Sequence, residues 1–328
     1  MTTKITIQQI AELAGVNKAT VSRVINGSAT ISDKTKEKIE KIIKEYNYVP
    51  NTLARGLASN KTFTIGFCHD YTDKRAFANL FFYKVLQGIE NVVYRNDYMF
   101  LMMSHHAREH GKSMFERVVS ERKVDGLLIP SALLTEENHQ LLIKHQIPFV
   151  VLGEEDFSKP DIRWVDVDNQ QAANVLTSHL AELGYRRIAI YYDKAAAARD
   201  RFIQHRIKGY SGTLSGLNLP HIVETDPEAL YACSPDAIIC CTHEQLFGLL
   251  DENKDVSAPR AASGIALATF DDSPLFQYLR RPIHYVSIDL ERMGEEAAAL
   301  LFSVIHQAAD IPDHLLIPTS SSNITQYD

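Results

Sequence analysis

The stretch from residue 5 to residue 26, ITIQQIAELAGVNKATVSRVIN, constrains the fold more than any other part of the chain. Its apolar residues recur at the spacing of a helix face in two groups. The groups are Ile10, Ala11 and Ala14, followed by Val21, Val24 and Ile25. Gly15 lies between the groups and can adopt the positive φ of a tight turn, and Asn17 is placed to cap the second helix. Two short helices joined by about four residues indicate a helix-turn-helix.

A third helix is predicted from residue 33 to residue 45, with Ser32 in the N-cap position. Its buried side is expected to carry Ile39, Ile42, Ile43 and Tyr46. Residues 1–60 contain nine Lys or Arg against five Asp or Glu, a net charge of +4. Because the whole 328-residue chain carries −7, residues 61–328 carry −11. A basic helical headpiece therefore precedes an acidic body.

Three motifs follow one another within the first 57 residues: I-x-x-I-A-x-x-A-G-V-x-x-x-T-V-S-R-V-I-N, Y-x-P-N and L-A-R-x-L. Together they resemble the lactose-repressor/galactose-repressor family of bacterial transcription regulators, and the resemblance extends over most of the chain. It implies a sequence-specific DNA-binding regulator, most often a repressor of carbohydrate-utilisation genes. A small molecule, expected to be a sugar or sugar derivative, would set its affinity for DNA.

Beyond a linker at residues 59–62, strand and helix patterns alternate, which predicts parallel sheets with helices on both faces. The predicted strands are 63–68, 98–103, 124–130, 148–152, 187–192, 222–223, 237–241 and 266–271. The predicted helices are 78–95, 109–121, 136–145, 169–183, 202–214, 244–250 and 293–307. The fold class is thus an all-α helix-turn-helix headpiece followed by an α/β core. The resemblance implies two lobes like those of periplasmic binding proteins, with three crossovers and a ligand cleft between them.

The predicted domains are a headpiece at 1–49, a hinge helix with linker at 50–61, and an effector-binding and dimerisation core at 62–328. Within the core, one lobe is expected to comprise 62–163 with 290–317, and the other 164–289 with 318–328. The stretch between Leu214 and Pro235 is short and leaves room for about one helical turn at 226–230.

In a helix-turn-helix, the second helix enters the major groove with its first residues at the base edges. The resemblance implies that Lys18, Ala19 and Arg23 read bases, and Arg23 can contact guanine with two hydrogen bonds. It places phosphate contacts, which set the register, at Thr6, Asn17, Thr20, Ser22, Asn26, Ser32 and Thr35. For all of these the alternative is capping or solvated surface. The resemblance assigns the hinge contacts to Asn51, Ala54 and Leu57, with Leu57 as an apolar wedge in the minor groove.

Two further motifs resemble the effector site of the family. Arg206-x-x-Gly209-Tyr210 matches a segment whose Arg hydrogen-bonds the effector, and Phe270-Asp271-Asp272 matches one whose first Asp does so. A fixed Arg and Asp suit a polyol, although a structural ion pair between the lobes is the alternative. Asp70 and Tyr71 follow the first core strand and are further candidates. His243 stands where relatives usually have Asp, which leaves the effector's identity open.

No enzyme, metal site or cofactor is predicted. The four cysteines, Cys68, Cys233, Cys240 and Cys241, form neither a zinc pattern nor a disulfide framework. His105, His106 and His110, or Cys241 with His243, supply too few ligands at recognised spacings. Catalytic and nucleotide-binding motifs such as GxSxG and the P-loop are absent. No leader or membrane span is evident, so a cytoplasmic protein without membrane partners is expected.

The predicted partners are a pseudo-palindromic DNA operator, a second copy of the chain and the small-molecule effector. One headpiece reads too few base pairs for specificity, which favours a homodimer over a monomer. A purine-responsive or phosphoprotein-responsive regulator is the alternative within the family, and a solute-binding protein or an enzyme is the alternative outside it. The sign of the response, inducer or corepressor, and the choice of dimer or tetramer stay open.

Overall fold

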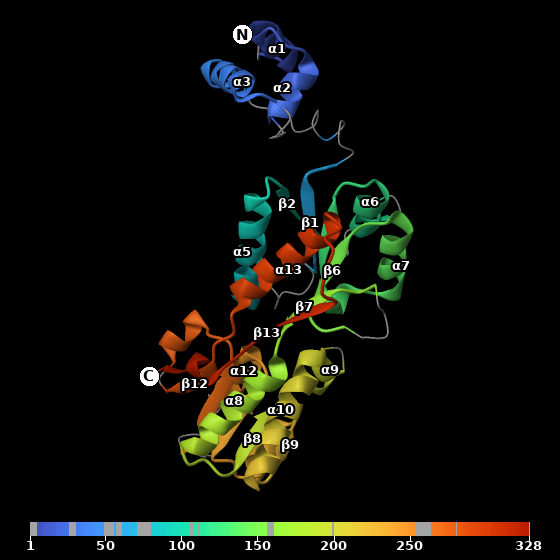
Figure 1. The fold of residues 1–328 in the computed structure, drawn as a ribbon. Coiled ribbons are helices and arrows are strands. Elements are labelled where there is room, and N and C mark those ends of the chain that lie inside the picture. The colour runs from blue at the N-terminus through green and yellow to red at the C-terminus, as the bar shows by residue number, and fades with distance from the viewer. Residues whose placement is uncertain are drawn as a thin grey trace. The chain divides into compact units, whose positions relative to one another are not determined.

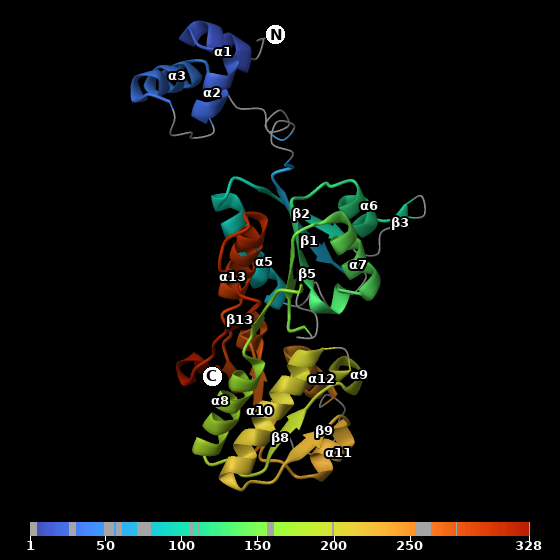
Figure 2. The same ribbon diagram turned by 45° about the vertical axis from the view of Figure 1, so that its right-hand side comes forward.

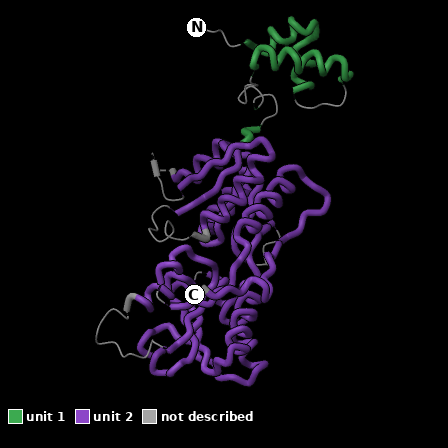
Figure 3. The backbone as a smooth tube through the Cα atoms, turned by 90° about the vertical axis from the view of Figure 1, so that its left-hand side faces the viewer, with its two compact units in different colours: residues 1–63 green, residues 64–328 purple. Residues whose placement is uncertain are grey.

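The structure, a computed structural model, describes residues 5–25, 31–48, 56, 61–70, 80–104, 108–109, 112–155, 161–198, 200–252, 264–279 and 281–327. The chain divides into two compact units, Met1–Phe63 and Thr64–Asp328 (Figure 3). Each unit has its own hydrophobic core. None of the described helices combines the length and the hydrophobicity that a membrane span requires.

The first unit contains three helices: α1 (Ile7–Ala14), α2 (Lys18–Ile25) and α3 (Asp33–Glu45). Helix α1 begins with a reciprocal capping box between Thr6 and Gln9, and it ends at Gly15, which has φ 66° as predicted. The Asn17 side chain accepts a hydrogen bond from the Thr20 backbone N–H at 2.7 Å, so it caps α2 as predicted. These local signals determine where the turn between α1 and α2 lies.

The headpiece core combines one apolar face from each helix. Its fully enclosed members are Ile10, Ala11, Ala14, Val21, Val24 and Ile39. One prediction for α3 was wrong: Tyr46 is 48% exposed rather than buried, because it lies past the last helical residue. Ser32 occupies the N-cap position as predicted, although its side chain makes no cap hydrogen bond. Ser32 Oγ instead shares a hydrogen bond with Thr35 Oγ1 at 2.9 Å.

The second unit contains two six-stranded sheets (Figures 1 and 2). The first has the order β13-β7-β6-β5-β1-β2, and all its strand pairs are parallel. Its strands are β1 (Thr64–His69), β2 (Met99–Ser104), β5 (Gly126–Pro130), β6 (Phe149–Leu152), β7 (Trp164–Val167) and β13 (His314–Ile317). Most of these strands are buried runs of apolar residues, as expected for a sheet covered on both faces.

The second sheet has the order β14-β12-β11-β10-β8-β9 and is parallel except for its edge pair β12–β14. Its strands are β8 (Ile188–Tyr191), β9 (Ile222–Glu224), β10 (Ala237–Cys240), β11 (Ala266–Phe270), β12 (Ile283–Val286) and β14 (Ile324–Tyr327). The sequence patterns did not predict β12, β13 or β14. These short strands near the end of the chain complete both sheets.

Helices cover both faces of each sheet. The first sheet packs against α5 (Leu80–Arg95) and α13 (Leu290–Ile305) on one face and α6 (Met114–Ser120) and α7 (Glu136–His145) on the other. The second packs against α8 (Asn169–Glu182) and α10 (Arg201–Leu217) on one face and α11 (Pro227–Ala232) and α12 (His243–Glu252) on the other. The remaining elements are short: α9 (Lys194–Ala197), β3 (Arg108–Glu109), β4 (Lys112–Ser113), η1 (Ser131–Leu133), η3 (Pro274–Tyr278) and η4 (Ser321–Asn323).

The lobe boundaries differ from those predicted at one crossover. Strand β7 pairs with β6 and β13 in the first sheet, so residues 164–167 belong to the first lobe and the chain crosses to the second only before α8. The predicted helix at 109–121 was also too long. Ser113 forms a capping box with Glu116, which starts α6 at Met114, and a two-stranded hairpin, β3 and β4, precedes it.

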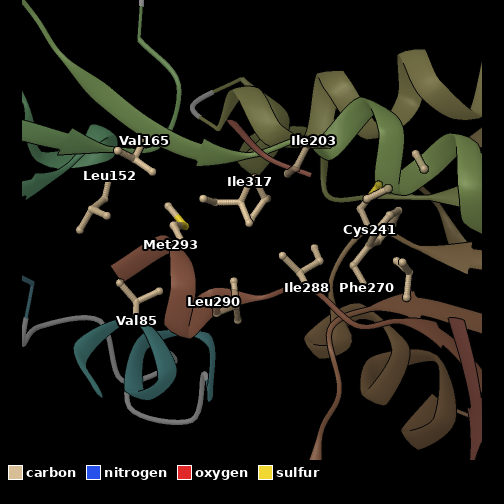
Figure 4. Close-up of a cluster of buried hydrophobic side chains, with 14 of the residues drawn as sticks. Val85, Leu152, Val165, Ile203, Cys241, Phe270, Ile288, Leu290, Met293 and Ile317 are labelled. Carbon is tan, nitrogen blue, oxygen red and sulfur yellow. The ribbon is translucent and has the colours of Figure 1, made fainter. Parts of the chain in front are cut away.

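One buried hydrophobic cluster runs without interruption from the first lobe into the second. Figure 4 shows Val85, Leu152 and Met293 at one end of it and Cys241 and Phe270 at the other. The chain crossings therefore pass through a shared apolar core, and the polar cavity described below lies beside it.

Candidate functional site

The exposed face of α2 carries the three residues predicted to read bases. Lys18, Ala19 and Arg23 are all exposed, whereas Val21 and Val24 on the opposite face are buried. Arg23 makes no hydrogen bond or ion pair with any of the described residues. This face can therefore enter a groove of DNA without breaking any contact that Arg23 makes inside the headpiece.

Several of the predicted phosphate contacts already have local partners. Thr6 belongs to the capping box of α1, Asn17 Oδ1 accepts from both the N–H and the hydroxyl of Thr20, and Ser32 pairs with Thr35. Capping thus accounts for Thr6 and Asn17 within the headpiece, and a side-chain hydrogen bond accounts for Ser32 and Thr35. Ser22 is half-buried on α2. The predicted residues Asn26, Asn51, Ala54, Leu57 and Tyr71 lie outside the described residues.

A cavity of about 270 Å³ lies between the two lobes of the second unit. It is bordered by residues at the carboxyl ends of β1, β6, β7 and β11, by α5 and α13, and by the first turns of α8, α10 and α12. Ligands of open α/β sheets bind at this edge, where strands end and helices begin. Of the five predicted effector residues, the structure places Arg206, His243 and Asp271 in this cavity.

Arg206 projects from α10 and is only 5% exposed. Its Nε donates to Asn169 Oδ1 at 2.9 Å, and one Nη donates to the Cys241 carbonyl oxygen at 2.5 Å. The guanidinium also stacks on the Phe270 ring at 4.0 Å from the ring centre. Burial lowers the pKa of Arg206, and the charge of Asp271 opposes that shift. The other Nη has no hydrogen bond with any described residue, which leaves it free to donate to a ligand.

Asp271 directly follows β11 and has φ 66°, a left-handed conformation that non-glycine residues rarely adopt. Its side chain is 8% exposed, and its Oδ1 is buried without a hydrogen-bond partner among the described residues. Burial raises the pKa of Asp271, and Arg206 acts against the rise. A strained, buried carboxylate with a free acceptor at a strand end is well suited to bind a ligand hydroxyl.

The sequence reasoning missed a second buried carboxylate in the cavity, Asp166 at the end of β7. Asp166 accepts hydrogen bonds from the backbone N–H groups of Glu154 at 3.0 Å and Val167 at 2.7 Å, and from Asn169 Nδ2 at 3.4 Å. Burial raises its pKa to about 6. Its position in the pattern W-V-D-V could have revealed it, because a charged residue inside an otherwise apolar strand needs a specific partner.

The remaining two effector predictions differ in outcome. His243 begins α12 and lines the cavity, with its Nε2 3.3 Å from Glu244 Oε1. Asp70 follows β1 but is not among the residues that line the cavity. The end of β1 instead contributes Phe67 to the wall.

The cavity offers binding groups rather than catalytic ones. No group of three His, Cys, Asp or Glu within the described part of the chain could hold a metal ion. Burial raises the pKa of the Cys241 thiol, the cysteine nearest Arg206, to about 12, so it is not a thiolate near neutral pH. Arg206, Asp271 and Asp166 together supply fixed donors and acceptors around a partly apolar space, which is typical of a small-molecule binding site.

Two kinds of comparison connect this arrangement with known proteins. Residues 6–51 match the lacI family of bacterial regulatory proteins, and residues 177–322 match a periplasmic binding protein-like domain. The chain is 28% identical over 319 residues to the HTH-type transcriptional repressor PurR of Vibrio vulnificus, covering 92% of each chain. It is 27% identical over 332 residues to catabolite control protein A of Staphylococcus xylosus, covering 96% of each.

Among solved structures, a complex of the transcriptional regulator CelR with cellobiose matches 98% of each chain at 25% identity, with a TM-score of 0.66. A lac repressor dimer bound to operator and the anti-inducer ONPF matches 97% of each chain at 20% identity, with a TM-score of 0.70. The latter similarity shows a shared fold: a helical headpiece followed by a two-sheet α/β core.

Proposed function

Because this chain belongs to the lacI family of bacterial regulatory proteins, we propose that it represses carbohydrate-utilisation genes under the control of a sugar-like effector. The chain is a DNA-binding transcription regulator, not an enzyme. The observation that carries the effector part of the proposal is the cavity in which Arg206, Asp271 and Asp166 converge from two lobes. The cellobiose bound in the related CelR structure supports a carbohydrate ligand.

The effector can act through the contacts that connect the lobes. The Lys84 ammonium on α5 pairs with Asp272, which follows β11. Glu154, which follows β6, lies 3.8 Å from Arg201 Nη1 and 3.3 Å from His205 Nδ1, both on α10. A ligand that binds one lobe arrangement more tightly than the other shifts the population toward that arrangement. The factor by which the ligand changes operator affinity cannot exceed the ratio of its affinities for the two arrangements.

We infer a homodimer on a pseudo-palindromic operator, because one α2 helix contacts too few base pairs for specific recognition. The lac repressor dimer on its operator is a relative in fold that is assembled in this way. The base-reading residues in this proposal are Lys18, Ala19 and Arg23. A regulator of this kind works where bacterial DNA is, so we place it in the cytoplasm.

The test is a fluorescence anisotropy titration of the purified full-length chain on duplexes from the region upstream of its own gene. We expect tight binding to one fragment, a fall in affinity as salt rises because lysine and arginine displace counterions, and a change in affinity with one sugar. Equal, salt-insensitive binding to all duplexes would refute a DNA-binding regulator. Purine bases belong in the same titration, since a purine that acts where every sugar fails would replace the sugar proposal.

A further inference from the structure

The charges that line the cavity are unbalanced. Its acidic residues are Glu154, Asp166, Asp200, Glu244 and Asp271. Its cationic residues are Arg201 and Arg206. With His243 neutral, the lining carries a net formal charge of −3. The cavity therefore sits in a local excess of negative charge, which a bound ligand has to tolerate or offset.

Both arginines of the cavity already have partners in the protein. Arg206 lies between the rings of Phe202 and Phe270, at 4.8 and 4.0 Å from their centres, and one of its Nη groups and its Nε already donate to protein oxygens. Arg201 lies 3.8 Å from Glu154 Oε1. Two of the five N–H groups of Arg206 are therefore used, and the remaining three belong to a cation whose charge already acts on Asp271 and Asp166.

The helix termini at the cavity favour anions, but their contribution is smaller. Three helices begin there: α8, α10 and α12. Each helix amino terminus acts as roughly half a positive charge, so the three together supply about +1.5. That sum does not cancel the net charge of −3. In addition, Asp168 accepts from the Gln171 N–H and so satisfies part of the α8 terminus.

Two buried carboxylates in the cavity, those of Asp166 and Asp271, keep free acceptor capacity. An ionised carboxylate has about four lone-pair sites, and Asp166 uses three of them. Asp271 Oδ1 has no partner among the described residues although it is buried. A ligand that brings hydroxyl or ammonium donors satisfies both carboxylates, whereas a ligand that brings further acceptors leaves them unpaired.

We infer that the cavity binds an uncharged or amine-bearing polyhydroxylated molecule and rejects phosphorylated and carboxylated sugars, with Asp166 as a residue that sets this selectivity. The inference rests on the proposed effector site and specifies the ligand class for it. Free sugars and sugar phosphates can both be effectors in principle. The excess of acidic residues in the cavity disfavours the phosphates.

The experiment measures binding to the full-length chain by thermal shift and calorimetry with matched sets of probes. Each set contains a free hexose, its 2-amino derivative and its 6-phosphate, and inorganic phosphate is tested alone. We expect the best free or amino sugar to bind at least about tenfold more tightly than its 6-phosphate, because a like charge within a few ångströms costs more than about 1.4 kcal/mol. Inorganic phosphate should leave Tm unchanged.

A 6-phosphate that binds as tightly as its free sugar, or a panel in which no free or amino sugar binds, overturns the inference. Failure of the proposed function is a separate result: the chain then shows no preference among duplexes in the anisotropy titration, whatever the charge of the ligands.

Asp166→Asn tests the role of the residue itself. We expect the preference for free or amino sugar over 6-phosphate to shrink by about tenfold, because one negative charge is removed. Glu182→Gln removes the same charge at the far end of α8, roughly 20 Å along the helix from Asn169, and should leave the preference unchanged. A cooperative thermal unfolding transition of ligand-free Asp166→Asn, together with unchanged duplex binding, establishes that both units of the variant are folded. An unchanged preference in that folded variant refutes the assignment to Asp166.

Discussion

Arg206 and Asp271 are each more than nine-tenths buried, and Asp271 keeps an acceptor that no described residue satisfies. Burying a charge is costly unless partners compensate it. The uncompensated acceptor therefore lowers the stability of the core when no ligand is bound. Binding sites commonly give up stability in this way, because a group that is satisfied in the free protein has little left to offer a ligand. Variants of Arg206 and Asp271 are therefore best compared by their response to the ligand, since a change in stability alone does not report on binding.

Arg206→Ala should abolish the effect of the sugar on operator affinity while the ligand-free chain still binds the operator. The substitution removes the donor to the ligand and the cation that faces Asp271, but it leaves the headpiece untouched. Anisotropy titrations with and without sugar measure both properties. Lys208→Ala is the matched control, because it removes an exposed cation from the same helix. A normal sugar response in Arg206→Ala would disprove its role in the cavity.

The stability of Asp166→Asn relative to the natural chain should rise between pH 4 and pH 7. Burial raises the pKa of Asp166 from 3.8 to about 6, so the native state holds a proton there that the unfolded state releases. Where the native state binds more protons than the unfolded state, the free energy of unfolding falls as pH increases. Asparagine does not titrate, so the variant lacks this fall. Over the whole interval, the free energy of unfolding of the variant minus that of the natural chain should increase by on the order of 3 kcal/mol. Urea unfolding of both proteins at each pH measures it, and parallel pH curves would contradict the prediction.

Arg23→Lys should lower the preference for operator over scrambled duplex, with a loss of roughly 1–3 kcal/mol at one base pair. Lysine keeps the positive charge but cannot form the paired hydrogen bonds that arginine makes with guanine. Non-specific affinity and its salt dependence should stay close to those of the natural chain. If specific and non-specific affinity fell together, Arg23 would be a phosphate contact instead of a base contact.

At the scale of elements, helices α8 and α10 approach so closely that a glycine is required at their contact. A Cβ added to Gly209 on α10 would lie 2.2 Å from the Gln170 carbonyl oxygen and 2.9 Å from the Ala173 Cβ, both on α8. On the same helix, a Cβ added to Gly212 would meet no atom within 4 Å. Two glycines three residues apart thus have opposite structural roles.

Gly209→Ala should destabilise the core by about 1–3 kcal/mol, since the two helices must separate to admit the methyl group. Gly212→Ala should stabilise it by up to about 1 kcal/mol, because alanine has the higher helix propensity and the position is open. Thermal and urea unfolding of the two variants provide a matched comparison. Equal effects would show that α8 and α10 are not packed as described.

Sequence patterns predicted the helix caps of the headpiece but not the edge strands of the two sheets. The capping signals at Thr6, Asn17 and Gly15 act within a few residues, and the structure follows them. Strand β13 was missed because it is four residues long, only its last residue is buried, and it has an ordered partner only in the distant β7. Strand β14 is likewise held in the sheet by its antiparallel pairing with β12. Edge strands of this kind have little pattern of their own.

For the whole molecule, operator binding should require two headpieces at a fixed separation. Inserting about five base pairs between the operator half-sites turns one half-site to the opposite side of the duplex, since one helical turn is about 10 base pairs. We expect this insertion to abolish specific binding by the full-length chain, as removal of one half-site should. Anisotropy titrations on the three duplexes measure it. Sedimentation at the same concentrations should give twice the 36.9 kDa of one chain. Full affinity for a single half-site would exclude the dimeric mode.

The sequence by itself determined the headpiece, the alternation of strands and helices in the core, and three of the residues that line the cavity, Arg206, His243 and Asp271. These features rest on short-range spacing, on caps, and on motifs that stay within a few residues. Only the tertiary structure decided that β7 belongs to the first sheet and that Asp166 meets Arg206 across the cavity. It also decided that Asp70 lies outside the cavity. The physical reason is that strand pairing and the packing of the two lobes join segments far apart in the chain. The residues next to a strand in the sequence do not determine which distant strand pairs with it.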